Sequence, residues 1–151
     1  MTSVSKWILL AEDDPKDAQL TTRALAEAKA PGSVVIARDG EEALDYLYGR
    51  TVASQTGIDS PPCVVLLDLK MPKINGLEVL RTIKSDPQLK TIPVVMLTSS
   101  RQDRDVAESY QLGANAYVVK PVSFTEFRAA LRDIGSFWTV LNELPPHSVV
   151  S

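Results

Sequence analysis

Five short apolar runs, each separated from the next by an amphipathic stretch, constrain the fold of this chain more than any other feature. Each run has four or five residues and is continuous rather than alternating, which is typical of strands buried on both faces of a sheet. The runs cover residues 7–11, 34–37, 64–67, 94–97 and 116–119. Because strand and helix patterns alternate five times, the sequence predicts parallel strands joined by helical crossovers.

Helical periodicity predicts one helix after each of these strands. The expected helices cover about residues 16–29, 41–48, 76–85, 102–112 and 123–144. Asp14 precedes Pro15 and is expected to cap the first helix, while Gly113 is the stop signal of the fourth. Ser123 and Glu126 form a capping box at the start of the fifth.

The expected architecture is α/β, a flavodoxin-like doubly wound sheet of five parallel strands in the order 2-1-3-4-5 with five helices. A chain of 151 residues suits one domain, spanning residues 1–151, whose last helix is extended. A polar segment over residues 50–62 is expected to be a surface insertion, since it exceeds the usual length of such a connection. Sites in such sheets lie at the carboxyl ends of the strands, near the switch between strands one and three.

Composition excludes several classes of protein. A net charge of −3 provides no general field for binding nucleic acid, and no stretch approaches the ~20 apolar residues of a membrane-spanning helix. The single cysteine, Cys63, allows no internal disulfide, and the first residues lack a signal-peptide pattern. A cytoplasmic location is therefore expected. The lone His147 and the absence of a second cysteine argue against a zinc site.

Polar side chains stand at the carboxyl ends of four predicted strands. Glu12 and Asp13 follow the first strand, Asp68 the third, Thr98 the fourth and Lys120 the fifth. The three carboxylates carry a charge of −3, which one Mg²⁺ and the lysine would balance. A carboxylate beside Mg²⁺ can attack a phosphoryl donor and form an acyl phosphate. Asp68 stands alone after the most apolar run and is the predicted nucleophile, with Glu12 and Asp13 around the metal.

The segments that contain these residues resemble the receiver domains of two-component response regulators. The matching segments are ILLAEDD, VVLLDLKMPKINGLEVL, IPVVMLTSS and GANAYVVKP. They stand in the order found in that family, and the resemblance covers about residues 6–134. It implies a phosphorelay signalling protein rather than an enzyme, although one with Mg²⁺-dependent self-phosphorylation and self-dephosphorylation at Asp68.

The resemblance also implies a role for each site residue. Asp68 would accept a phosphoryl group from a histidine of a sensor kinase. Asp13 and Asp68 would ligate Mg²⁺ directly, Lys70 would offer its backbone carbonyl, and Glu12 would act through a water molecule. In this family the positions of Lys70 and Ser100 tune the lifetime of the phosphoryl group.

The resemblance further implies a conformational switch. Thr98 would hydrogen-bond to the phosphoryl group, and Lys120 would form a salt bridge to it. Tyr117 would move inward as Thr98 shifts, which would change the surface of the fourth helix, the fifth strand and the fifth helix. The peptide bond between Lys120 and Pro121 is expected to be cis, as the family implies.

The last helix carries an apolar face that its own sheet is too short to cover. A helix over residues 123–143 would measure about 30 Å, whereas a five-residue strand spans about 17 Å. We expect the overhanging end to form a homodimer interface, to which the fifth strand and the fourth helix contribute. The interface residues would be Phe137, Trp138, Val140, Leu141 and Leu144. Only this helix and a short tail follow Lys120, so no output domain is expected.

The tyrosines of the second helix, the insertion at 50–62 and the FW…LPP ending resemble small regulators that partner phytochrome-type histidine kinases. A phytochrome is therefore the expected upstream kinase. It would dock near the first helix and the phosphorylation loop, where Ala18, Thr22 and Leu25 are expected to offer a modest apolar surface. The alternative is an intermediate phosphorelay shuttle for a non-phytochrome kinase.

Four other classes are less compatible with the sequence. An aspartate-based phosphatase would place a second aspartate at the position of Lys70, and a flavodoxin-like FMN binder would need a hydroxyl- and glycine-rich loop in place of Glu12 and Asp13. A P-loop NTPase is excluded because the GxxxxGK[ST] motif is absent. A degenerate receiver that acts only as a scaffold is disfavoured because all five site residues are present.

Overall fold

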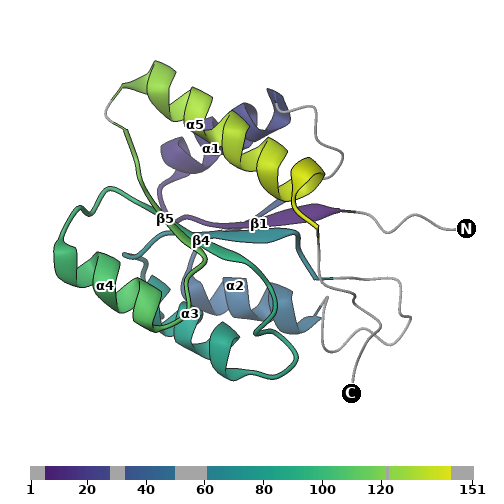
Figure 1. The fold of residues 1–151 in the computed structure, drawn as a ribbon, viewed down its shortest axis with the longest axis vertical. Coiled ribbons are helices and arrows are strands. Elements are labelled where there is room, and N and C mark those ends of the chain that lie inside the picture. The colour runs from purple at the N-terminus through teal and green to yellow at the C-terminus, as the bar shows by residue number, and fades with distance from the viewer. Residues whose placement is uncertain (1–5, 28–32, 50–60, 122, 144–151) are drawn as a thin grey trace, which may run out of the picture.

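The computed structural model describes residues 6–27, 33–49, 61–121 and 123–143. Within these residues, strands and helices alternate along the chain as the sequence predicts (Figure 1). The elements are β1 (Trp7–Ala11), α1 (Pro15–Glu27), β2 (Ser33–Ala37), α2 (Gly40–Leu47), β3 (Val64–Leu67), α3 (Gly76–Ser85), β4 (Val94–Thr98), α4 (Asp103–Gln111), β5 (Ala116–Val119), α5 (Phe124–Ser136) and the π-helix η2 (Phe137–Leu141). Most of the expected insertion, together with Leu144 and His147, lies outside the described residues.

The five strands form one parallel sheet in the order β2-β1-β3-β4-β5, which confirms the predicted doubly wound topology. The register sets Ala11 at the end of β1 beside both Ala37 and Leu67. It likewise sets Thr98 at the end of β4 beside Val119. The residues that follow these strands therefore emerge at one edge of the sheet.

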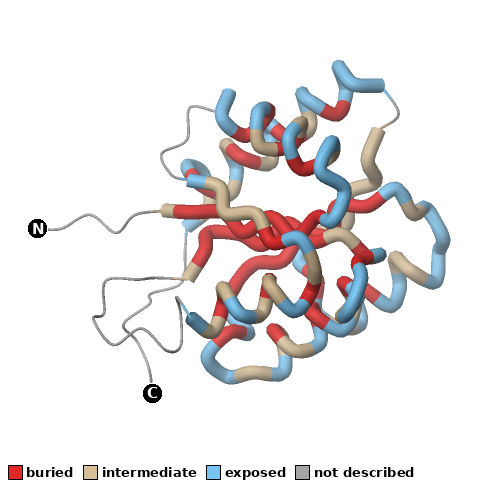
Figure 2. Tube along the Cα trace, turned by 180° about the vertical axis from the view of Figure 1, so that it is seen from behind, coloured by how far each residue is buried: buried red, intermediate tan, exposed pale blue. Residues whose placement is uncertain are grey.

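Helices cover both faces of the sheet, with α1 and α5 on one side and α2, α3 and α4 on the other (Figure 1). Every residue of β1, β3 and β4 is buried, and the strands form the buried centre of the molecule in Figure 2. The edge strand β5 is only half-buried, because it has a hydrogen-bonded neighbour on one side alone. The continuous apolar pattern therefore corresponds to complete burial only in the three central strands.

The predicted capping residues occupy the helix starts. The carboxylate of Asp14 accepts a hydrogen bond from the backbone N–H of Lys16 at 2.9 Å, and Ser123 accepts one from Glu126 at 3.4 Å. Gly113 follows α4 with a φ of 106°, a left-handed conformation that favours glycine. Among the described residues, no helix has the length and apolarity needed to cross a membrane.

The end of the last helix is divided between a packed side and an exposed side. Trp138 packs against the cluster of buried residues on the α1 face of the sheet, and the buried Thr139 donates its hydroxyl to the carbonyl of Gly135 at 2.6 Å. Phe137, Val140 and Leu141 remain exposed, Leu141 to 73%. The packed side ties this turn to its own domain, and the exposed side is available to a partner.

Candidate functional site

The register of β1 and β3 brings three carboxylates together at the carboxyl edge of the sheet. Glu12 and Asp13 follow β1, Asp68 follows β3, and the backbone N–H of Asp68 donates to the carbonyl of Ala11 at 3.1 Å. One carboxylate oxygen from each acid lies within 4.8 Å of the other two. The acidic set predicted from the strand ends is therefore assembled in the fold.

These three acids differ in their exposure to water. Glu12 is only 3% exposed, Asp68 is half-buried and Asp13 is exposed. Burial raises the pKa of Glu12, the hydrogen bond from Lys120 opposes this shift, and the charge of Asp68 adds to it. Carboxylate oxygens are the ligands that Mg²⁺ prefers, and a metal that keeps several waters suits a site with one open acid. The donor set fits a hard divalent cation.

Lys120 neutralises part of this charge from the end of β5. Its ammonium nitrogen lies 2.5 Å from a carboxylate oxygen of Glu12, 3.0 Å from one of Asp17 and 3.6 Å from one of Asp68. Burial alone would lower the pKa of Lys120, but the hydrogen bond to Glu12 and the charges of Asp68 and Glu12 raise it well above its usual value. The lysine therefore remains a cation at neutral pH.

A polar cavity of about 320 Å³ opens beside Asp68 and has room for a phosphoryl group. The buried Thr98, at the end of β4, contributes its hydroxyl, which accepts a hydrogen bond from the backbone N–H of Ser100 at 3.4 Å. The cavity is lined by Asp68, Lys70, Thr98, Ser99, Ser100, Arg101 and Gln102. Thr98, predicted to hydrogen-bond to the phosphoryl group, and Lys70 and Ser100, whose positions are expected to tune its lifetime, thus lie at one opening.

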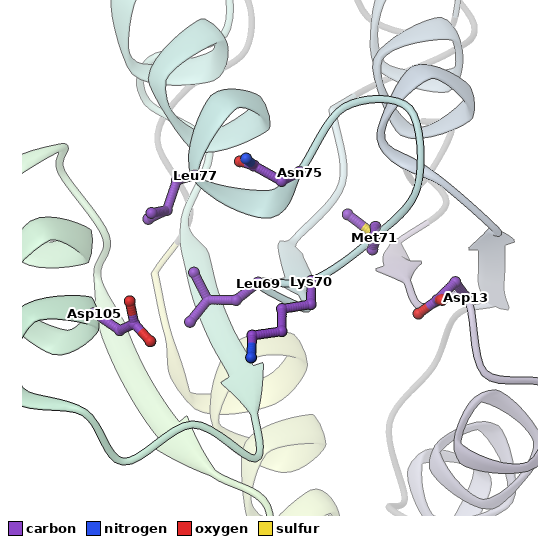
Figure 3. A pocket seen from close by; sticks show the side chains of 7 residues that line it. All are labelled: Asp13, Leu69, Lys70, Met71, Asn75, Leu77 and Asp105. Atoms are coloured by element: carbon purple, nitrogen blue, oxygen red, sulfur yellow. The ribbon is translucent and has the colours of Figure 1, made fainter.

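A neighbouring cavity of about 410 Å³ is lined by residues of the loop that follows β3, together with Asp13 and Asp105. Figure 3 shows Lys70 on this loop, between Asp13 and Asp105. Lys70 lines both cavities, so it is adjacent to the phosphoryl opening and to the acidic set.

Tyr117, the predicted switch residue, is connected to the site through Ser100. Its hydroxyl donates to the backbone carbonyl of Ser100 at 3.0 Å, and its ring packs against the cluster under α2 and α3. The Ser100 hydroxyl in turn donates to a carboxylate oxygen of Asp105 at 2.6 Å. Ser100 therefore contacts Thr98, Tyr117 and the first turn of α4.

Two acids near the site, Asp17 and Asp105, were not among the residues that the sequence predicts. Each lies in the first turn of a helix, where acidic residues are common because they interact favourably with the helix dipole. The only sequence signal for a further role was their position just after strand ends.

Two expectations attached to the resemblance are wrong for this structure. The Lys120–Pro121 peptide bond is trans, since the described residues contain no cis bond; trans is the intrinsically favoured isomer before proline. Leu25, expected on a kinase-docking face with Ala18 and Thr22, is buried among β1, β3 and β4 residues instead. Ala18 and Thr22 both line a groove of about 620 Å³ on the surface of α1.

The comparisons with known proteins agree with this geometry. A profile of the response regulator receiver domain matches residues 8–132. The response regulator Rcp1 of Synechocystis is 38% identical over 141 residues, which cover 93% of each chain. A crystal structure of Rcp1 in its Mn²⁺-bound form superposes with a TM-score of 0.82 at 36% identity, covering 93% of this chain and 99% of Rcp1.

Two further solved structures match over nearly the whole chain. The phosphorylated cyanobacterial phytochrome response regulator RcpA gives a TM-score of 0.84 at 40% identity, covering 94% of this chain and 99% of RcpA. The bacteriophytochrome response regulator RtBRR is 55% identical with a TM-score of 0.70, covering 95% of this chain and 86% of RtBRR. This chain therefore belongs to the response regulator receiver domain family, as a phosphoacceptor response regulator of two-component signalling.

Proposed function

We propose that Asp68 is the phosphoacceptor of this response regulator and that a sensor histidine kinase is the donor. One observation carries the assignment: the Asp68 carboxylate meets the Glu12 and Asp13 carboxylates within 4.8 Å and opens onto the cavity that Thr98 lines. Asp68 is the member of the acidic set that borders this cavity. In the reaction, an Asp68 oxygen bonds to phosphorus while the phosphorus–nitrogen bond to the donor histidine breaks.

The chain's own residues prepare this step. Asp13 and Asp68 would hold Mg²⁺ directly, with the Lys70 carbonyl as a further ligand and Glu12 acting through water. When bound, the metal supplies positive charge that offsets the carboxylates and the transferring phosphoryl oxygens. The Mn²⁺-bound structure of Rcp1 supports a divalent metal in a related acidic site. Lys120 adds a fixed positive charge 3.6 Å from a carboxylate oxygen of Asp68.

Phosphorylation would then act on Thr98 and Tyr117. The phosphoryl group adds nearly two negative charges and three acceptor oxygens at Asp68. A Thr98 hydroxyl drawn toward it moves the segment that holds Ser100, to which the Tyr117 hydroxyl is bonded. The changed surface of α4, β5 and α5 is the proposed output.

The labelling experiment compares the wild-type protein with Asp68→Asn. With Mg²⁺ and acetyl phosphate, the wild type should become phosphorylated and Asp68→Asn should not, as followed on phosphate-affinity gels. Asp45→Asn, at an exposed acid of α2, is the matched control and should label like the wild type. Labelling of Asp68→Asn at the wild-type level would remove Asp68 as the acceptor.

A phytochrome is the proposed upstream kinase, and a cytoplasmic location is proposed with it. The support is the similarity to RcpA and RtBRR, which are phytochrome and bacteriophytochrome response regulators. A relay shuttle for a non-phytochrome kinase is the alternative. Phosphotransfer rates to the purified chain from a panel of kinases distinguish the two, since the cognate kinase should transfer much faster than the others. The fastest transfer from a non-phytochrome kinase would reject the phytochrome assignment.

A homodimer through the end of the last helix is also proposed. Phe137, Val140 and Leu141 support it, because they expose apolar side chains on one short turn, and the expected interface also includes Trp138 and Leu144. Light scattering should show a dimer at micromolar concentration that Leu141→Ser weakens. Asp45→Ser, at an exposed residue of α2 outside the expected interface, is the control. A monomeric wild type, with and without a phosphoryl analogue, would contradict the proposal.

A further inference from the structure

Lys120 is shared among three carboxylates, and one of them, Asp17, lies outside the acidic set that would hold a metal. Asp17 comes from the first turn of α1, whereas the metal set comes from the ends of β1 and β3. The ammonium nitrogen of Lys120 is 3.0 Å from Asp17 Oδ2 and 3.6 Å from Asp68 Oδ2. Only the first of these distances is that of a hydrogen bond.

The three N–H donors of the ammonium limit what Lys120 can contact at once. One donor is committed to Glu12, which is only 3% exposed, so little water is available to replace the lysine. A second is committed to Asp17, whose side chain is 37% exposed and can be hydrated after the bond breaks. Asp17 is therefore the partner that Lys120 can release at least cost.

We propose that Asp17 is a positioning residue that holds Lys120 toward α1 in the unphosphorylated protein and competes with the phosphoryl group on Asp68 for this cation. The inference rests on the proposed function, since it takes Asp68 as the acceptor. The phosphoryl group adds negative charge at the side of Lys120 that has no hydrogen bond. The third donor can form a hydrogen bond there only if the ammonium moves closer than its present 3.6 Å toward Asp68, and Asp17 resists this movement by holding the ammonium at 3.0 Å. Asp17 therefore lowers the affinity of the site for a phosphoryl group.

The test measures binding of fluoroberyllate, a phosphoryl analogue, to the whole chain in the presence of Mg²⁺. Asp17→Asn should tighten fluoroberyllate binding by about twofold to fivefold, the size expected for a half-exposed ion pair. Asp14→Asn is the matched control, because it removes the same charge next to the pocket while asparagine still caps α1. A change in Asp17→Asn no larger than that in Asp14→Asn would overturn the proposal.

A second pair of variants separates competition for Lys120 from a general charge effect. In a Lys120→Ala background, Asp17→Asn should change fluoroberyllate affinity no more than Asp14→Asn does. Asp17→Glu, which keeps the carboxylate, should return the affinity toward the wild-type value and shows that the loss of charge, rather than altered folding, is responsible. Persistence of the full Asp17→Asn effect in the Lys120→Ala background would overturn the proposal.

Asp68→Asn separates failure of the proposed function from failure of the role of Asp17. Binding of fluoroberyllate to the wild type that is unaffected by Asp68→Asn would reject the proposed function and this inference together. Binding that depends on Asp68 but responds equally to Asp17→Asn and Asp14→Asn would reject only the role of Asp17.

Discussion

The phenolic hydroxyl of Tyr117 donates a hydrogen bond to the backbone carbonyl of Ser100, with an oxygen–oxygen distance of 3.0 Å. The backbone N–H of Ser100 donates to the Thr98 hydroxyl at 3.4 Å, and its side chain donates to Asp105 at 2.6 Å. The aromatic residue of the proposed switch and its threonine thus contact one residue of the loop after β4. A displacement of Thr98 would therefore be transmitted to Tyr117 by the hydrogen bonds through Ser100, in addition to any space that the movement of Thr98 opens for the ring.

Tyr117→Phe removes this hydrogen bond and leaves the ring in place. Burial raises the pKa of Tyr117, so its hydroxyl is a protonated donor throughout the neutral range. The free energy of unfolding should fall by about 1 kcal/mol, because the Ser100 carbonyl loses a donor. Tyr110→Phe, at a half-exposed tyrosine of α4, is the control and should change it by less than about 0.5 kcal/mol in denaturant titrations. Equal effects of the two substitutions would show that the Tyr117 hydroxyl adds nothing to the resting state.

Most of the fold follows from local sequence patterns. The runs that become β1, β3 and β4 are continuous because helices cover both faces of these strands. The run that becomes β5 is also continuous and predicts full burial, but β5 is only half-buried. Its position at the edge of the sheet depends on the whole sheet and not on the strand's own sequence. The packing of Trp138 onto the α1 face is another tertiary relationship that the spacing of apolar residues does not specify.

The candidate site likewise contains residues that local sequence patterns predict and residues that only the tertiary structure reveals. Residues at strand ends, such as Asp68 and Lys120, could be predicted because a parallel sheet brings the carboxyl ends of its strands to one edge. Asp17 and Asp105 act through side chains that reach across from helices, and their sequence positions are equally well explained by the helix dipole. Leu25 is the converse case, because the apolar spacing of α1 does not distinguish a residue on its core face from one on its surface.

Adjacent threonines on α1 provide a test of a buried hydroxyl. Thr21 is fully buried, and its hydroxyl has no hydrogen-bond partner among the described residues. Thr21→Val should raise the free energy of unfolding by about 1 kcal/mol, since an unsatisfied polar atom leaves the core. Thr22 donates its hydroxyl to the carbonyl of Ala18 at 2.8 Å, so Thr22→Val should leave stability unchanged or lower it. Chemical denaturation that shows Thr21→Val to be the less stable variant would contradict this assignment.

Gly76 is required where the loop after Asp68 enters α3. A Cβ atom at this position would lie 2.1 Å from the backbone oxygen of Asp68 and 2.8 Å from the Cα of Leu69. Gly76→Ala should therefore displace the loop, lower the free energy of unfolding by about 1–3 kcal/mol and reduce phosphorylation by acetyl phosphate. Gly49→Ala is the control, because a Cβ there meets nothing within 4 Å. Wild-type stability and labelling of Gly76→Ala would show that the loop can move without cost.

Binding of Mg²⁺ should release a proton near neutral pH. Burial raises the pKa of Glu12 to about 7, against the opposing hydrogen bond from Lys120 and with added repulsion from Asp68. The metal-free folded state therefore holds this proton more tightly than the unfolded chain, whose glutamate has a pKa of 4.5. The contribution of Glu12 to metal-free stability is most favourable below pH 4.5 and is lost as the pH rises to about 7. A divalent cation favours the ionised carboxylate, so the apparent affinity for Mg²⁺ should increase over the same range and level off above it.

Calorimetric titrations of Mg²⁺ measure the released protons directly when they are run at pH 6 and at pH 8.5, each in two buffers of different ionisation enthalpy. Wild-type protein should release a substantial fraction of one proton per metal at pH 6 and little at pH 8.5. Glu12→Gln cannot ionise and should release almost none at either pH, although it also loses the ion pair with Lys120 and should bind the metal less tightly. Asp14→Asn controls for the removal of a nearby charge and should retain the pH-dependent release, because its side chain is exposed and caps α1. Equal proton release by the wild type at the two pH values would mean that Glu12 is already ionised at pH 6 and that the ammonium of Lys120 outweighs its burial.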